Sequence, residues 1–320
     1  MLYLSIAVGL ALLVVGGESL VRGAVALAAR LGVSSLVIGL TVVGFGTSTP
    51  ELVTSLQAAF AGSPGIAVGN VVGSNTANIL LILGIAALIA PIAVSRTAFR
   101  RDGTALVLVT LAAVAVVLTG SLSRMAGVAL LVGLVLYLML AYRSERRPSE
   151  AGTPAEAATE TAPPDAIASP LALPMALAYA LGGIALTVLG AHLLVSGGSE
   201  LAARFGVSDA IIGLTLVAVG TSLPELVTSV VAGLRRQGDV AFGNVVGSNI
   251  YNVLGILGAT ALVKPIPVPE RIAEFDAWVM GLATLALVAV AVSGWRVGRL
   301  EGAALLIAYA AYIGWVAAGA

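Results

Sequence analysis

The sequence predicts an all-α polytopic membrane protein built from two inverted repeats of five transmembrane helices each. The first observation is composition, because 59% of the 320 residues are hydrophobic and only 10% are charged. Mean hydropathy is +1.07, a value that excludes a soluble domain of this length. The second observation is an internal duplication. Residues 39–84 align without a gap with residues 213–258, and 27 of the 46 positions are identical.

The third observation is a count of ten apolar segments long enough to cross a membrane as helices. The first half contains five, at about 2–29, 34–60, 66–90, 103–120 and 124–142. The second half contains five more, at about 171–202, 208–234, 240–263, 275–293 and 299–318. Because five is an odd number, the second half is expected to lie upside down relative to the first, about a pseudo-two-fold axis in the membrane plane.

The two halves are joined by a polar segment, residues 143–170, which is rich in Pro, Ala, Thr and Glu. This composition cannot bury a core, so we interpret the segment as a flexible linker that acts as a tether rather than a regulatory element. The predicted domains are therefore a first repeat at 1–142, the linker at 143–170 and a second repeat at 171–320.

The distribution of Lys and Arg predicts the orientation in the cell membrane. With the N-terminus outside, twelve of these residues lie in cytoplasmic segments and four in outer segments. This asymmetry satisfies the positive-inside rule. We therefore expect both termini outside and the linker in the cytoplasm.

Each copy of the duplicated stretch carries one carboxylate, Glu51 or Glu225, in an otherwise apolar run. An ionisable side chain at membrane depth is costly and indicates function. Thr47, Ser48 and Glu51 are spaced i, i+1 and i+4, so a helix brings their oxygens near one face. Pro50 lies between them and removes a backbone hydrogen bond, which predicts a broken helix at mid-membrane.

The next helix of each copy adds a serine and an asparagine to this polar face. In the first copy these are Ser74 and Asn78, four residues apart. Carboxylate, hydroxyl, amide and free carbonyl oxygens form a hard ligand set that suits Na⁺ or Ca²⁺ and does not suit zinc or copper. Two facing glutamates would repel each other when the site holds no ion, and a divalent cation between them would remove that repulsion.

The strings GTS-x-PE and GSN-x-x-N, each present twice in ten spans, resemble the α-repeats of the cation/Ca²⁺ antiporter superfamily. They are most similar to those of its prokaryotic Na⁺/Ca²⁺ exchangers. The resemblance implies secondary active exchange of about three Na⁺ for one Ca²⁺ by alternating access, in which the first and sixth spans slide against the rest. It also implies ion coordination at mid-membrane by matching residues, which are Thr47, Ser48, Glu51, Ser74, Asn78, Thr221, Ser222, Glu225, Ser248 and Asn252.

Other transport modes stay open at this point. Some relatives, including K⁺-dependent exchangers, have Asp at the position of Asn252. With Asn there, the site of this chain has only two formal charges, which disfavours K⁺ co-transport. H⁺/Ca²⁺ antiporters of the superfamily usually show a different motif around the glutamate. A cation channel could use Glu51 and Glu225 as a selectivity ring, but many deep ligands and inverted repeats favour alternating access. We do not expect an enzyme, because the only histidine, His192, has no repeat-matched serine partner.

The remaining features limit the partners. The absence of Cys excludes disulfides, thiolate chemistry and zinc fingers, and no basic cluster suggests nucleic acid. We expect Ca²⁺, Na⁺ and the lipid bilayer as partners, no cofactor, and a functional monomer. Polar residues outside the predicted ligand set receive structural or open interpretations. Glu18 and His192 occupy equivalent positions, and we interpret them as anchors near helix ends in preference to gating or proton-relay groups. We interpret Asn75 and Asn249 as helix–helix contacts. Either a structural role or a place along an access path is open for Thr54, Ser55, Thr228 and Ser229.

Overall fold

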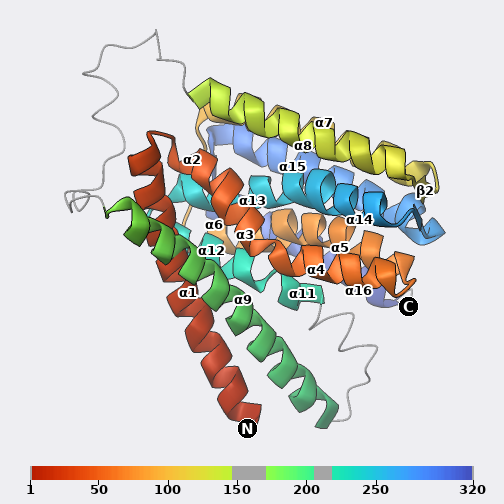
Figure 1. The fold of residues 1–320 in the computed structure, drawn as a ribbon, viewed down its shortest axis with the longest axis horizontal. Helices are drawn as coiled ribbons and strands as arrows, with labels where there is room; N and C mark the ends of the chain where they lie inside the picture. The colour runs from red at the N-terminus through yellow and green to blue at the C-terminus, as the bar shows by residue number, and fades with distance from the viewer. Residues whose placement is uncertain (1, 146–170, 205–217, 319–320) are drawn as a thin grey trace.

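The computed structural model describes residues 2–145, 171–204 and 218–318. Figure 1 shows a block of roughly aligned helices, with a further pair, α1 and α9, leaning across one side of it. Within the described ranges, seven helices are long and apolar enough to cross a membrane, and a bent pair forms one more candidate. The predicted helical membrane fold is therefore confirmed. Most of the predicted linker and the start of the predicted seventh span lie outside the described residues, so the count of ten spans stays a prediction.

The first half begins with α1 (Leu2–Leu31) and ends with α8 (Arg124–Glu145). Between them lie α2 (Ser35–Ile38), the π-helical η1 (Gly39–Val43), α3 (Gly44–Thr47), α4 (Thr49–Phe60), α5 (Pro64–Ala77), η2 (Asn78–Leu83), α6 (Gly84–Ile89) and α7 (Arg96–Leu118). Helix α7 begins at Arg96 rather than at 103, because its charged first turns continue the helix beyond the apolar segment.

The second half begins with α9 (Leu173–Arg204) and ends with α16 (Arg299–Ala318). Between them lie α11 (Ala218–Thr221), α12 (Leu223–Leu234), α13 (Gly238–Tyr251), η4 (Asn252–Leu257), α14 (Gly258–Val263), η5 (Ile272–Asp276) and α15 (Ala277–Gly294). We call the end of the block where α8 finishes and α9 starts the linker side, and the opposite end the far side.

Four two-residue strands, which the all-α prediction missed, connect the two halves. Strand β1 (Ile92–Ala93) pairs antiparallel with β4 (Arg296–Val297), and β2 (Ser121–Leu122) pairs antiparallel with β3 (Ile266–Pro267). The first pair adjoins the start of α7, and the second adjoins its end. The block is therefore joined across the two halves at both of its ends.

Helices α1 and α9 pack against each other through glycine. A Cβ built on Gly183 would lie 2.7 Å from the Cα of Leu20, and one built on Gly16 would lie 2.7 Å from the backbone nitrogen of Thr187. Such short distances mean that the backbones touch directly, as in other close contacts between membrane helices. Position 16 meets 187 and position 20 meets 183, so residue numbers rise along one helix as they fall along the other, and the pair is antiparallel.

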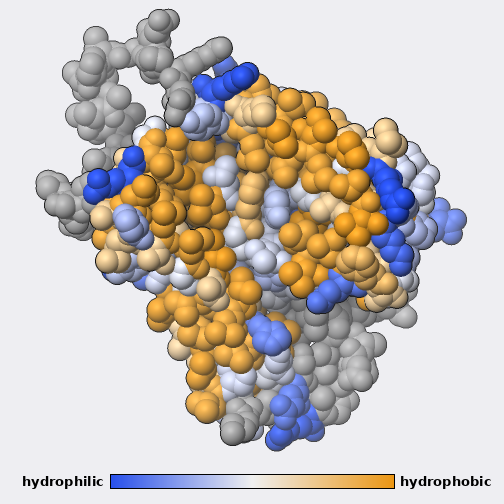
Figure 2. Space-filling model, in the orientation of Figure 1, coloured by the Kyte–Doolittle hydropathy of each residue, from blue (hydrophilic) through white to orange (hydrophobic). Residues whose placement is uncertain are grey.

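The outer surface is mostly apolar. Hydrophobic side chains cover much of the face seen in Figure 2, and strongly hydrophilic ones gather toward its edges. On α8, for example, Met125, Val132, Leu136 and Leu140 are all more than half exposed. This distribution suits contact with lipid along the block and with water at its ends.

Candidate ion-binding site

Each half contains a broken helix that carries a glutamate. In the first half, α3 ends at Thr47 and α4 begins at Thr49, and Ser48 between them has φ −80° and ψ 11°. The segments before and after this break are bent by 44°. Pro50 in the first turn of α4 has no N–H to donate, and the Thr49 hydroxyl donates to the carbonyl of Gly46 at 2.9 Å. The predicted break is confirmed.

The second half repeats this arrangement. Ser222, with φ −90° and ψ 8°, lies between α11 and α12, and Pro224 occupies the first turn of α12. Glu51 and Glu225 stand in the first turns of α4 and α12, and each is only 1% exposed. A carboxylate at this position interacts favourably with the positive end of the helix dipole.

The glutamate of each half accepts a hydrogen bond from the serine of the other half. Ser48 Oγ donates to Glu225 Oε1 at 2.7 Å, and Ser222 Oγ donates to Glu51 Oε1 at 3.0 Å. The two breaks therefore meet inside the block. The two carboxylates lie close enough to repel each other when both are charged.

Four buried oxygens beside these bonds have no hydrogen-bond donor. They are Oε2 of Glu51, Oε2 of Glu225, Oδ1 of Asn78 and Oδ1 of Asn252, two from each half at equivalent positions. A buried polar atom without a partner costs roughly 1–3 kcal/mol, and more when it is charged. These four acceptors fit a cation, which supplies the missing positive charge, whereas Nδ2 of Asn78 is a buried donor that also has no partner.

The predicted ligands all come from the elements around the two breaks. Nine of the ten are buried, and Thr221 is half-buried. Thr47 Oγ1 lies 3.0 Å from the carbonyl oxygen of Val43, and Ser248 Oγ donates to the carbonyl of Gly44 at 3.2 Å. In the described part of the chain, no place gathers three or more His, Cys, Asp or Glu side chains. The glutamate pair with its neutral oxygens is therefore the strongest candidate for a cation site.

Two π-helical segments shape this site. Both η2 and η4 are six residues long, and they begin at Asn78 and Asn252. A π-helical turn inserts an extra residue and shifts the faces of the helix that follows, and such turns are frequent at functional sites. The sequence analysis did not predict these segments.

The amide side chains beside the site confirm one predicted contact and change another. Asn75 Nδ2 donates to the backbone carbonyl of Asn249 at 3.1 Å, and Asn252 Nδ2 donates to Asn75 Oδ1 at 3.0 Å. Asn75 thus joins the halves, as predicted, and leaves the Asn252 oxygen free. The Asn249 side chain instead donates within its own helix, to the carbonyl of Val245 at 2.7 Å.

Asn70 and Asn244 hold the two glutamates in position and were missed in the sequence analysis. Asn70 Nδ2 donates to the backbone carbonyl of Glu51 at 3.0 Å and to Ser55 Oγ at 2.9 Å. Asn244 makes the two equivalent bonds in the second half, at 3.1 and 2.9 Å. A usable signal was present, because both asparagines are identical in the duplicated stretch. Their serine partners therefore have a structural role, and Thr228 is buried without a partner.

We expect Asn244→Ala to weaken cation binding at this site more than Ser229→Ala does. The first change removes both hydrogen bonds that fix the turn of Glu225 and also the Oδ1 that accepts from Thr47 Oγ1 at 3.2 Å, whereas the second removes one bond. A loss of about 1–2 kcal/mol corresponds to a roughly five- to thirtyfold higher cation concentration for half-maximal binding. Binding titrations of both purified variants provide the measurement. Equal affinities for Asn244→Ala and the parent would contradict the positioning role.

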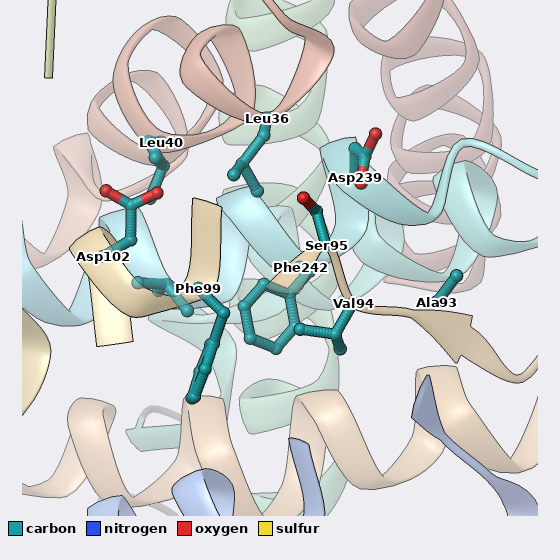
Figure 3. Close-up of a pocket in the computed structure, with 10 residues that line it drawn as sticks. Leu36, Leu40, Ala93, Val94, Ser95, Phe99, Asp102, Asp239 and Phe242 are labelled. Atoms are coloured by element: carbon teal, nitrogen blue, oxygen red, sulfur yellow. The ribbon is translucent and has the colours of Figure 1, made fainter. Parts of the chain in front are cut away.

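A second group of carboxylates lies on the linker side and is not a comparable site. A cavity there has a volume of about 10 Å³. Figure 3 shows its lining, which is mainly apolar side chains such as Phe99 and Phe242, with Asp102 and Asp239 at its edge. Both oxygens of Asp102 accept hydrogen bonds from Arg101, at 2.7 and 2.9 Å. The cavity has room for about one water molecule. We interpret it as a packing defect beside a structural ion pair.

Comparison with known proteins agrees with this geometry. Residues 1–143 and 175–318 match the family model described as sodium/calcium exchanger protein. The chain is 39% identical over 309 residues to the putative antiporter CaxA of Alkalimonas amylolytica, with 95% of each chain covered. It is 34% identical over 343 residues to the sodium/calcium exchanger MaX1 of Methanosarcina acetivorans, with 97% of each covered.

The fold is similar to that of the sodium-calcium exchanger NCX_Mj, in a structure soaked with zero Na⁺ and Ca²⁺. The TM-score is 0.82 at 32% sequence identity, and the match covers 99% of this chain and 100% of that chain. The resemblance predicted from the duplicated motifs is confirmed. The family model matches both halves, and the two serine–glutamate pairs between the halves agree with that match. The chain therefore belongs to the sodium/calcium exchanger protein family.

Proposed function

We propose that this protein exchanges Na⁺ for Ca²⁺ by alternating access and binds both ions between the two broken helices. The family supports Ca²⁺ antiport, and the four buried oxygens without donors carry the assignment of the site. The proposed ligands are the ten predicted residues. Glu51 and Glu225 supply the charge, and the hydroxyl and amide oxygens complete a shell that Ca²⁺ accepts at its usual coordination numbers.

The charge of the site implies that exchange is electrogenic. One Ca²⁺ neutralises the two carboxylates, whereas three Na⁺ would leave one surplus positive charge. Movement of that charge couples exchange to the membrane potential, by about 2.3 kcal/mol per elementary charge for each 100 mV. Exchange should therefore accelerate or slow when the potential is clamped with K⁺ and valinomycin.

We also propose the inverted arrangement and the orientation predicted from the sequence. Strand pairing supports inversion, because the equivalent strands β1 and β3 adjoin opposite ends of α7. Equivalent positions also carry opposite charges. Arg96 and Arg100 open α7, whereas the matching positions hold Glu270 and Glu274 and so no basic residue, which agrees with the positive-inside rule for two oppositely placed ends.

The orientation can be measured with a single cysteine in this Cys-free chain. We expect Glu150→Cys, within the linker, to react with a membrane-impermeant thiol reagent only after the cells are permeabilised. Reaction in intact cells would place the linker outside and reverse the proposed orientation.

Flux into proteoliposomes tests the function. We expect Na⁺ loaded inside the vesicles to drive uptake of radioactive Ca²⁺, and equal Na⁺ on both sides to abolish it. A parallel experiment replaces the Na⁺ gradient with a pH gradient. Uptake driven only by the pH gradient would make the protein an H⁺/Ca²⁺ antiporter. Uptake without any counter-gradient would indicate a channel.

A further inference from the structure

A cluster of three charged side chains connects α1 to the linker-side end of α12. Glu18 lies in the middle of α1 rather than near a helix end, which corrects the predicted anchor position. Its Oε1 accepts from Nε of Arg22 at 2.6 Å, and its Oε2 accepts from Nε of Arg235 at 2.9 Å. A second guanidinium nitrogen of Arg235 also donates to Glu18. We call these residues the Glu18 cluster.

The Glu18 cluster has no counterpart in the other half. The repeat offset of 174 residues relates Glu18 to His192, Arg22 to Ser196, and Arg235 to Ala61. Because alanine has no charged group, the matching end of α4 cannot form this contact with α9. The two halves are otherwise closely matched at the ion site, so the difference sets the two ends of the protein apart.

Backbone packing shows the same asymmetry. A Cβ built on Gly17 would lie 2.9 Å from Val227 Cγ1 and 3.4 Å from Val231 Cγ2, so α1 lies directly against α12. The described part of α9 does not pack along α4 in this way. The α1–α9 pair is therefore held against the block at its linker side by both apolar and ionic contacts.

Separating α1 from α12 would break the cluster. The Glu18 side chain is 27% exposed and that of Arg235 is 50% exposed, so water already screens part of their attraction. Two-pronged bonding by one guanidinium still fixes the geometry of the pair. A lone charge on a membrane helix is costly, so Glu18 would need water or a new partner after separation.

We propose that the Glu18 cluster is a conformational latch that keeps the linker side of the ion site closed. Among the described residues the far side shows no matching ion pair, so the ion-free protein is expected to favour the state that is closed on the linker side. The inference rests on the proposed alternating access. It adds that the two closed states are unequal in energy, and that three residues outside the ion site set the difference.

Distances between α1 and α12 test the latch directly. Leu31, at the end of α1, and Leu234, at the end of α12, are both exposed and can be replaced by cysteine and spin-labelled. Pulsed electron paramagnetic resonance of the full chain in nanodiscs then gives the distribution of distances. We expect one main population in the labelled parent. Glu18→Gln and Arg235→Gln should each add a longer-distance population, at least fivefold enriched over its level in the parent.

Two further variants make the result specific. Glu200→Gln removes an exposed ion pair with Arg204 that lies within α9 alone, so it should leave the distances unchanged. The reversed pair, Glu18→Arg with Arg235→Glu, should restore the parental distribution. Unchanged distances in both Glu18→Gln and Arg235→Gln would overturn the latch, and so would an equal shift in Glu200→Gln.

The distance measurement also separates this inference from the proposed function. It needs neither ion flux nor a known coupling ion. If Na⁺-driven Ca²⁺ uptake occurs but the distances do not change, only the latch fails. If the distances shift but the Na⁺ gradient drives no uptake, only the proposed coupling fails. When both hold, the Ca²⁺ concentration for half-maximal uptake from the far side should rise by the ratio of the main population in the parent to that in the variant.

Discussion

Glu51→Gln and Glu225→Gln should each abolish Ca²⁺ exchange while the protein stays folded. Glutamine keeps the shape of the side chain and an oxygen that can accept from the partner serine. It removes one of the two negative charges beside a doubly charged ion. Ca²⁺ would then be only half neutralised in a site of low dielectric constant.

The expected effect is large. Even at an effective dielectric constant of about 20, a unit charge a few ångströms away contributes several kcal/mol per cation charge. A loss of only about 3 kcal/mol weakens binding more than a hundredfold. Stability should not fall, because the ion-free protein no longer has to bury two mutually repelling carboxylates.

Transport and folding must be measured on the same preparations. Na⁺-driven Ca²⁺ uptake gives the activity, and thermal unfolding in detergent gives the stability. The matched control is Glu200→Gln, which removes an exposed carboxylate bonded to Arg204 on its own helix. Parental uptake by either glutamine variant would mean that the glutamate concerned is not a principal ligand.

Gly183→Ala should destabilise the protein, whereas Gly182→Ala should not. A Cβ at 183 would lie 2.7 Å from the Cα of Leu20, so α1 and α9 must separate to admit it. A Cβ at 182 meets no atom of the described residues within 4 Å. Both substitutions improve intrinsic helix propensity by up to about 1 kcal/mol. The difference between them therefore isolates the close packing.

Overpacking of this kind costs about 1–3 kcal/mol. We expect a lower unfolding temperature and slower exchange for Gly183→Ala, and parental values or slightly higher stability for Gly182→Ala. Thermal unfolding followed by size-exclusion chromatography compares the two. Similar unfolding temperatures for both variants would show that the α1–α9 contact tolerates separation.

The sequence predicted the features that depend on local chemistry. Hydropathy located the helices, and Pro50 predicted the break because its missing N–H acts within its own turn. The charge of Glu51 in an apolar run pointed to the site. The start of α7 was misplaced because a charged first turn leaves no hydropathy signal, although it is helical.

Features that depend on distant parts of the chain could not be predicted in the same way. The pairing of Ser48 with Glu225 joins residues 177 apart in sequence, and nothing local to either residue indicates the other. The π-helical segment that begins at Asn78 consists mostly of apolar residues that would equally suit an α-helix, so the hydrophobic periodicity of the sequence does not reveal it. The contact of Glu18 with Arg235 joins residues 217 apart, so nothing local to Glu18 indicated its partner.

The crossed serine–glutamate bonds have an evolutionary consequence. A protein with only the first half would hold Glu51 without the Ser222 hydroxyl, and Ser48 without its acceptor. A second copy of the same half, related to the first by a two-fold axis, could supply both groups. In the inverted arrangement proposed above, a single-repeat ancestor would function as a pair of oppositely inserted copies. Fusion of two copies into one chain would then assign one copy to each sense, and positions such as 18 and 192 could differ between the two ends.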